Sequence, residues 1–310
     1  MQARKLLTAL SGLALAAAMP VLAQVKIGVI ASSSGPTAFV GIPQKNAVAL
    51  LPKKAGNLNI EYVVFDDASD STQSVQLTKK LLSETKIDAL IGPSGSPNAM
   101  GVLGFMAEGK TPMLAPVGTP AVVQPMDDKK RWVFKTHPND DVISEGLIAA
   151  MKKRGVKTIG FIGYNDPYGE SWYKVFSPMA KAAGIEIVAN ERYSRQDTSV
   201  TGQVAKLISV KPEAVLVAGV AAGAALPHGQ LVDAGYKGGI YHTHGSASGA
   251  FIQIGAKKVE GALVVGPLLL VLDEIADSNA TKKVALEFVT AYEKQFASRP
   301  PIFGAGVYDA

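Results

Sequence analysis

Short apolar segments alternate with amphipathic segments along most of this chain. The apolar segments are rich in β-branched residues, which is typical of parallel strands that are buried on both faces. Between them, apolar residues recur at helical spacing, as at Ala99, Val102, Leu103 and Met106. The predicted strands are Val25–Ile30, Ile60–Phe65, Ala89–Ile91 and Met113–Ala115 in the first half, and Thr158–Ile162, Ile185–Ala189, Ala214–Val217 and Ile240–His242 in the second half.

This rhythm occurs twice, with helices expected near 140–153, 168–183, 198–209 and 222–234 in the second half. Two such series predict an α/β protein with two doubly wound parallel-sheet lobes joined by hinge crossovers. The candidate crossovers are Arg131–His137 and Ala262–Gly266. A later apolar stripe over Val284, Phe288, Tyr292 and Phe296 belongs either to a new lobe or to a return to the first. We expect lobe 1 at 24–136 plus 267–310 and lobe 2 at 137–266.

The two ends of the chain carry separate signals. Arg4 and Lys5 precede an apolar run that leads to small residues before Gln24. This pattern predicts a secretory signal peptide over residues 1–23 and a periplasmic protein. At the other end the chain stops within what reads as the start of a helix. We therefore expect a sequence truncated at its C-terminus.

Composition narrows the classes of function. The 310 residues are 47% hydrophobic, carry a formal net charge of +5 and include no cysteine. Without cysteine, the chain has no disulfide, thiolate metal site, cysteine nucleophile or cysteine-linked lipid anchor. The mild and scattered positive charge does not indicate nucleic-acid binding.

The carboxyl ends of the predicted strands hold the most informative residues. In open parallel sheets, ligands bind beyond these ends, where helices begin. Small hydroxyl residues and glycines gather there, as at Gly92–Ser96, Val117–Thr119 and Thr243–Ser246. Such turns offer hydroxyls and free N–H groups beside a helix N-terminus, so an anion is the natural ligand. Taken singly, Ser96 and Thr119 are equally typical of plain helix caps.

Other chemistries fit the residues less well. Gly104–Thr111 has phosphate-loop spacing, but here a helix precedes a strand, the reverse of the order that this chemistry requires. His242 and His244 lie two apart on one expected strand and share a face, yet no third metal ligand accompanies them. No nucleophile, acid–base pair or cofactor motif stands out. We expect no catalytic residue, no metal and no cofactor, and therefore not an enzyme.

From Val25 onward the chain resembles the type I periplasmic solute-binding proteins of the leucine/isoleucine/valine class. The matching landmarks, in order and spacing, are Lys26-Ile27-Gly28, Ser34-Gly35-Pro36, Asp66-Asp67, Ile91-Gly92-Pro93, Tyr168-Gly169-Glu170 and Val259-Glu260-Gly261. This resemblance implies a monomeric protein that closes on a small carboxylate ligand and delivers it to the membrane permease of an ABC importer. It also implies that Ser96, Gly118 and Thr119 hold the carboxylate and that Tyr168 closes over it. Phe39 and Ala221 would shape the side-chain pocket.

His244 is the most informative departure from this class. Amino-acid binders of the class place an acid there to pair with the ligand ammonium, whereas this chain has a histidine. The resemblance is therefore closest to the branch that binds aromatic acids such as benzoate, hydroxybenzoate or phenylpyruvate, whose distal or keto oxygen would meet His244. A leucine, isoleucine or valine ligand stays as the alternative, as do a periplasmic enzyme and a sensor domain.

Overall fold

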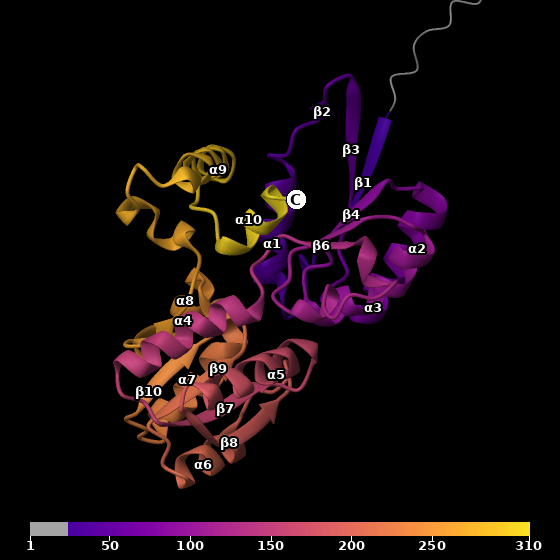
Figure 1. Cartoon of the computed structure of the whole chain (residues 1–310). Coiled ribbons are helices and arrows are strands. Elements are labelled where there is room, and N and C mark those ends of the chain that lie inside the picture. Colours follow the sequence, from indigo (N-terminus) through magenta and orange to yellow (C-terminus); the bar gives the residue numbers. More distant parts are fainter. Residues whose placement is uncertain (1–23) are drawn as a thin grey trace, which may run out of the picture.

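The structure, a computed structural model, describes residues 24–310. These residues form two lobes, each built around its own sheet (Figure 1). The predicted α/β architecture of two doubly wound parallel-sheet lobes is confirmed. The predicted signal peptide lies outside the described residues.

The first lobe contains a six-stranded sheet with β1 in its interior. Strand β1 pairs in parallel with β3 on one side and with β4 on the other. The crevice beyond the carboxyl ends of β1 and β4 is therefore the topological switch point of this lobe. From edge to edge, the strands are β2 (Lys54–Ala55), β3 (Leu58–Phe65), β1 (Gln24–Ile30), β4 (Ala89–Ile91), β5 (Met113–Ala115) and β6 (Val133–Lys135).

The second lobe contains a five-stranded parallel sheet in which β7 pairs with β8 and β9. From β7 the chain continues to β8 at one edge of this sheet, whereas from β9 it continues to β10, toward the other edge. Because crossover connections are right-handed, the helices α5 and α7 that follow β7 and β9 lie on opposite faces. From edge to edge, the strands are β11 (Leu263–Val264), β10 (Gly239–His242), β9 (Ala214–Ala218), β7 (Thr158–Tyr164) and β8 (Glu186–Tyr193).

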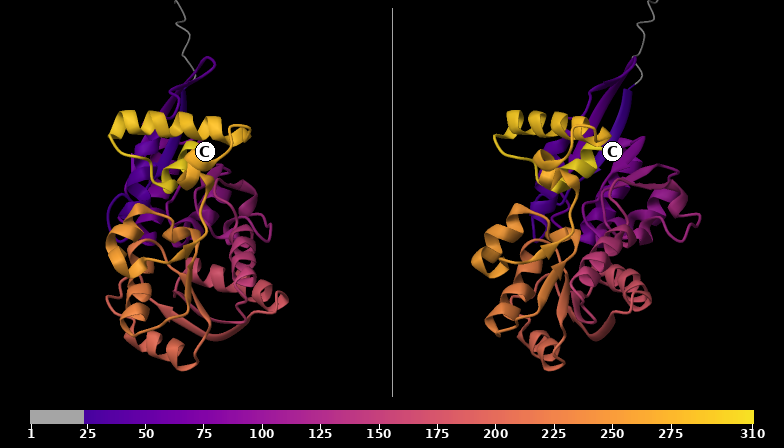
Figure 2. Two further views of the ribbon diagram at one scale, coloured as in Figure 1. Left: turned by 90° about the vertical axis from the view of Figure 1, so that its left-hand side faces the viewer. Right: turned by 60° about the vertical axis from the view of Figure 1, so that its left-hand side comes forward.

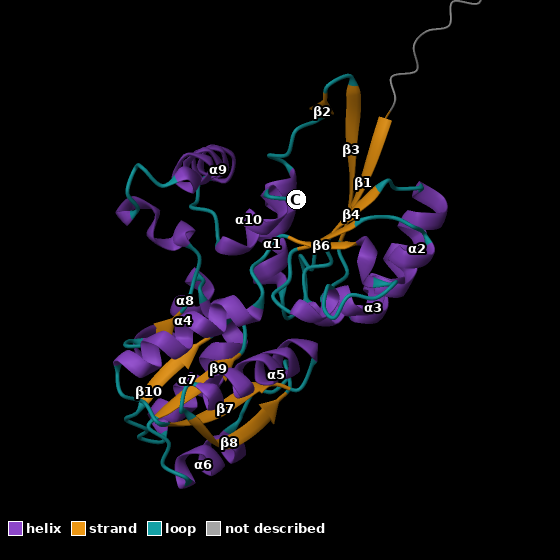
Figure 3. Ribbon diagram, viewed as in Figure 1, coloured by secondary structure: helices purple, strands orange, loops and turns teal. Residues whose placement is uncertain are grey.

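Helices cover both sheets (Figure 3). In the region of the phosphate-loop spacing, helix α3 precedes strand β5, as predicted. The helices of the first lobe are α1 (Ala38–Val48), α2 (Ser71–Lys80) and α3 (Ser96–Glu108). Those of the second lobe are α4 (Asp140–Lys153), α5 (Pro167–Ala182), α6 (Thr201–Ser209), α7 (Ala222–Asp233) and α8 (Gly249–Gly255).

The chain returns to the first lobe after β11, which settles the choice that the sequence left open. Helices α9 (Ala280–Phe296) and α10 (Ile302–Tyr308) lie beside the first lobe in both views of Figure 2. Phe288 and Tyr292 pack in one buried cluster with Val29 and Ala47. Val284, which the sequence placed on the same apolar stripe, is instead 52% exposed because α9 turns that part of its surface to solvent.

The two candidate crossovers are edge strands. Strand β6 pairs with β5, and the chain then enters α4 of the second lobe. Strand β11 pairs with β10, and the chain then leads to α9 beside the first lobe. Each crossover therefore leaves its sheet at an edge strand.

Candidate functional site

A small cavity of about 50 Å³ lies between the two lobes. The residues that line it come from both lobes and mostly follow the carboxyl ends of strands. They are Thr37, Val40, Ser94, Gly95, Ser96, Pro116, Val117, Gly118, His137, Tyr168, Arg195, Val220, His244, Gly245 and Phe303.

The first lobe contributes the N-terminus of helix α3 to the cavity. Gly95 is the N-cap residue and Ser96 is the first helical residue, followed by Pro97. Proline suits this position because a first-turn N–H has no partner within the helix. Within residues 24–310, the Ser96 hydroxyl makes no hydrogen bond and stays available to a ligand. The partial positive charge of the helix N-terminus favours an anion there.

Gly118 follows β5 and faces the same cavity. Lys135 donates through Nζ to the Gly118 carbonyl and, at 2.7 Å, to Asn139 Oδ1, which holds the loop in place. A Cβ atom at Gly118 would lie 2.8 Å from His244 Cε1 and 2.9 Å from Asp140 Oδ1. A side chain at this position would therefore fill the space into which His244 and Asp140 both project.

A buried polar chain connects the lobes behind Gly118. Thr119 Oγ1 donates to Ser171 Oγ at 2.9 Å, and Ser171 donates to Asp140 Oδ2 at 3.0 Å. Burial raises the pKa of Asp140 to about 7, opposed by the nearby charge of Lys135 and the hydrogen bond from Ser171. Among the described residues, no group donates to Asp140 Oδ1. This oxygen is a polar group that a ligand or water can satisfy.

Tyr168 comes from the first turn of α5 in the second lobe. Its hydroxyl is 2.8 Å from Thr243 Oγ1, so one end of the ring is fixed to the loop after β10. Burial raises the pKa of Tyr168 well above its ordinary value, and the side chain stays neutral. Its ring lies edge-on to His244, with centroids 6.3 Å apart. Tyr168 thus forms a rigid aromatic wall.

His244 projects into the cavity from the loop after β10. Burial, with the nearby His137 and Lys135, lowers the pKa of His244 to about 3, so the imidazole is neutral at physiological pH. Its Nδ1 atom is buried and makes no hydrogen bond with any residue of 24–310. A neutral imidazole beside Gly118 can donate to or accept from a ligand group, but it cannot balance a positive charge.

Arg195 lines the cavity from beyond the end of β8. Its Nε atom donates to Asp166 Oδ2 at 2.6 Å, and its guanidinium carbon lies 4.2 Å from the centroid of the Tyr164 ring. Burial alone would lower the pKa of Arg195, but the charge of Asp166 outweighs burial and holds this pKa above its ordinary value. The cavity therefore contains a fixed cation that the sequence interpretation missed.

The seven predicted site residues divide into two groups. Ser96, Gly118, Tyr168 and His244 line one cavity. Thr119 is fully buried, and its hydroxyl is occupied by Ser171 and Ala121. Phe39 packs behind Phe303, with ring centroids 6.3 Å apart, and Phe303 is the ring that lines the cavity. Ala221 is fully buried and donates its N–H to the Gly245 carbonyl, while its neighbour Val220 forms the wall.

The expectation that His242 and His244 share one strand face is wrong. Strand β10 ends at His242, and His244 begins a short 3-10 helix that turns it toward the cavity. His242 instead stacks on His228 in the second lobe, with His228 Nδ1 2.8 Å from His242 Nε2. In the part of the chain that the structure describes, no group of three or more His, Cys, Asp or Glu residues is placed to bind a metal ion.

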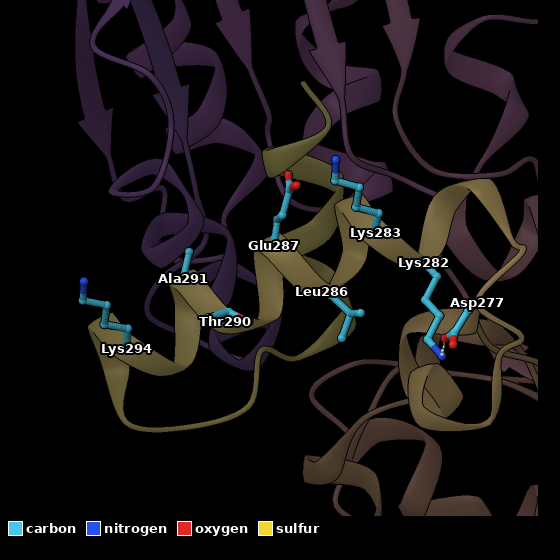
Figure 4. Close-up of a pocket in the computed structure, with 8 residues that line it drawn as sticks. All are labelled: Asp277, Lys282, Lys283, Leu286, Glu287, Thr290, Ala291 and Lys294. Carbon is cyan, nitrogen blue, oxygen red and sulfur yellow. Dashed lines mark hydrogen bonds and ion pairs between the residues drawn. The ribbon is translucent and has the colours of Figure 1, made fainter.

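A second depression runs along α9, away from the cavity between the lobes (Figure 4). All of its lining residues except Asp277 belong to this one helix, and Asp277 is paired with Lys282 at 2.7 Å. Leu286 points away from Glu287 and Lys283 in this view. This shallow groove lacks convergent polar groups, so the cavity between the lobes is the candidate site.

A family model described as "Periplasmic binding protein" matches residues 24–310. The chain belongs to this family. An extracellular ligand-binding receptor from Rhodopseudomonas palustris HaA2 is 41% identical, with a TM-score of 0.89 over 92% of this chain and 80% of that chain. The Leu/Ile/Val-binding protein BraC3 of Rhizobium johnstonii is 28% identical over 84% of this chain and 72% of its own length.

The predicted resemblance to the leucine/isoleucine/valine-binding class is confirmed by these relatives. A solute-binding protein of a Rhodopseudomonas palustris ABC transporter, solved in complex with benzoate, has the same fold, with a TM-score of 0.77 and 22% identity over 92% of this chain and 78% of that chain. The chain is thus a solute-binding protein of the branched-chain amino acid type of ABC transporter. No helix within residues 24–310 is long and apolar enough to cross a membrane.

Proposed function

We propose that this solute-binding protein captures an aromatic carboxylate of the benzoate, hydroxybenzoate or phenylpyruvate type and delivers it to an ABC importer. The observation that carries the proposal is the neutral His244 beside Gly118, where amino-acid binders of this class place an acid. An unpaired ligand ammonium buried at this point costs several kcal/mol. That cost is comparable with the whole binding energy of a micromolar ligand, about −8 kcal/mol.

The carboxylate of the ligand is placed at the N-terminus of α3 in this proposal. Ser96 and Gly118 line the cavity, and neither the Ser96 hydroxyl nor the Gly118 N–H makes a hydrogen bond to another described residue. Charge-assisted hydrogen bonds of this kind contribute about 1.5–3 kcal/mol each. His244 lies beside Gly118, so it meets a group near the carboxylate, such as the keto oxygen of a 2-oxo acid.

The ring of the ligand is placed between apolar and aromatic side chains. Val40 and Phe303 line the first-lobe side of the cavity, and Tyr168 and Val220 line the second-lobe side. Burial of one ring between such walls favours binding in proportion to the apolar area removed from water. Solved proteins of the same fold hold benzoate in one case and isoleucine in another, so the fold accommodates either class of ligand and the choice between them rests on the residues of the cavity.

A branched-chain amino acid is the second candidate, and Asp140 is the observation that favours it. Asp140 Oδ1 has no donor among the described residues and lies 2.9 Å from the point where a Gly118 Cβ would sit. An ionised Asp140 would pair with a ligand ammonium. Burial raises the pKa of Asp140 and so opposes the charged form that this pairing needs. Because His244 also lies 2.9 Å from the same point and carries no negative charge, we favour the aromatic acid.

The experiment that tests the proposal is calorimetry with benzoate, 4-hydroxybenzoate, phenylpyruvate, leucine, isoleucine and valine. We expect binding of the aromatic acids and none of the three amino acids at the same concentrations. Binding of leucine, isoleucine or valine alone would establish the second candidate instead.

As part of the same proposal, residues 1–23 direct export to the periplasm without a lipid anchor, and the protein acts as a monomer with a membrane permease.

A further inference from the structure

Two arginines near the end of β8 have similar surroundings but different bonding. Arg192 pairs with Glu170 and Arg195 with Asp166, and both carboxylates belong to the first turn of α5 or its cap. Each guanidinium also stacks on aromatic rings, Arg192 on Phe161 and Arg195 on Tyr164. Their side chains are 22% and 19% exposed, so burial does not distinguish them.

The protein occupies four of the five N–H donors of Arg192. Its Nε and Nη2 atoms donate to the two carboxylate oxygens of Glu170, at 2.6 and 3.2 Å. Its Nη1 atom donates to Asn190 Oδ1 and to the Glu191 carbonyl. Arg192 does not line the cavity between the lobes. All three nitrogen atoms of this guanidinium already donate to the protein, and its one remaining N–H lies outside the cavity lining.

Arg195 uses only one of its nitrogen atoms. Nε donates to Asp166 Oδ2 at 2.6 Å, and neither Nη atom donates to any residue within 24–310. Asp166 is itself fixed, because its other oxygen caps α5 by accepting the N–H groups of Tyr168 and Gly169. The guanidinium is therefore held rigidly with two donor groups unoccupied, and a planar pair of donors matches an acceptor oxygen or a carboxylate.

The position of Arg195 indicates which end of a ligand it contacts. Arg195 lines both the cavity and an adjoining surface groove beside α7, whereas Ser96 and Gly118 line the cavity alone. A ligand whose carboxylate lies at Ser96 and Gly118 would thus direct its far end toward the boundary that Arg195 occupies. A polar group at that far end would reach the Nη donors of Arg195 while the ring of the ligand stays in contact with the apolar walls.

We propose that Arg195 selects for aromatic acids that carry a second acceptor oxygen, a hydroxyl or a carboxylate, at the ring position opposite the first carboxylate. This inference rests on the proposed function and narrows its ligand class. The bound oxygen accepts from the Nη groups of Arg195, while Asp166 continues to hold Nε.

The test is calorimetry on the full chain with benzoate, 4-methylbenzoate, 4-hydroxybenzoate and benzene-1,4-dicarboxylate. The methyl and hydroxyl compounds are close in size and differ in the acceptor oxygen. We expect the hydroxyl and dicarboxylate compounds to bind about tenfold more tightly than 4-methylbenzoate. Arg195→Gln should reduce this preference to about threefold or less and change the dissociation constant of 4-methylbenzoate little. The matched variant Arg192→Gln should leave the preference intact.

Several outcomes would overturn the inference. A wild-type protein without a preference for the hydroxyl over the methyl compound would do so, even if Arg195→Gln failed to fold. An Arg195→Gln variant that weakened all four ligands equally would show that Arg195 only supports the wall formed by Tyr168. If all four acids bound equally, only this inference would fail. If none bound while leucine did, the proposed function would fail and the inference with it.

Discussion

The two lobes present different kinds of chemical group to the cavity. The first lobe offers the Ser96 hydroxyl, a helix N-terminus and the backbone at Gly118, together with apolar residues such as Val40. The second lobe offers Tyr168, Arg195 and His244, which are aromatic or ionisable. Hydroxyls and backbone N–H groups recognise a carboxylate whatever else the ligand carries. The first lobe therefore suits the feature that all ligands of this type share, and the second lobe suits the features that distinguish them.

This difference between the lobes predicts how a substitution in each lobe will affect ligand affinity. A change in the first lobe should weaken all acids together, whereas a change in the second lobe should alter their order of affinity. The predictions that follow test this division, from the largest expected effect to the smallest.

The substitution His244→Glu should have the largest effect. A carboxylate at this position would face the ligand carboxylate near Gly118, and we expect aromatic acids to bind about 100-fold or more weakly. An amino acid such as leucine should gain affinity, because its ammonium would acquire a partner. Calorimetry with phenylpyruvate and leucine measures both changes, and His244→Gln is the neutral control. Equal responses of the two ligands would contradict the assigned role of His244.

The substitution Gly118→Ala should weaken all ligands of the site. The added methyl group would lie within 3 Å of His244 and Asp140, so these side chains must move or the ligand must be displaced. Overpacking of about 1–3 kcal/mol corresponds to a loss of roughly 5- to 150-fold. Gly104→Ala is the matched control, because a Cβ at Gly104 has no atom within 4 Å. Unchanged affinity in Gly118→Ala would place the ligand elsewhere.

The substitution Ser96→Ala should weaken benzoate and phenylpyruvate alike, by about tenfold, since one charge-assisted hydrogen bond is lost. Calorimetry measures the two dissociation constants. Ser209→Ala, at an exposed serine of α6, is the control and should change neither value. If Ser96→Ala changed the order of affinity instead of lowering both, the division of roles between the lobes would be wrong.

The smallest effect concerns the pH dependence of stability. The unfolded state protonates His244 near pH 6.5, whereas the folded state does so only at about pH 3, so the folded state loses stability as the pH falls below 6.5. His244→Gln lacks this loss. Between pH 7 and pH 5, its Tm should therefore fall by about 2–4 °C less than that of the wild type. Parallel falls in Tm for the two proteins would show that His244 is not held neutral.

The sequence predicted the fold well because β-branched strands and amphipathic helices follow simple periodicities. Strands β1, β4 and β5 were predicted within one residue. The end of β8 was missed, because polar Asn190, Glu191 and Arg192 interrupt the apolar pattern while their backbones still pair with β7. This pairing extends the strand to Tyr193 and places Arg195 just beyond its carboxyl end. Because the apolar pattern stops at Ala189, Arg195 was not predicted as a site residue.

The candidate site was only partly predictable for a related reason. Strand ends and turn residues indicated Ser96, Gly118, Tyr168 and His244, which the fold brings to one cavity. The side chain of Thr119 depends on a contact with Ser171, a residue distant in sequence, and no local pattern reveals that contact. Asp140 likewise appears as an ordinary first-turn acid of α4, although the packed lobes bury it.

The most direct test of the central claim compares phenylpyruvate with phenylalanine by calorimetry on the wild-type protein. The two ligands share a ring and a carboxylate and differ in a keto oxygen against an ammonium group. If His244 is neutral and no charge balances an ammonium, phenylpyruvate binds at micromolar concentrations and phenylalanine binds at least about 100-fold more weakly. Equal or tighter binding of phenylalanine would contradict the account and identify Asp140 as the partner of a ligand ammonium.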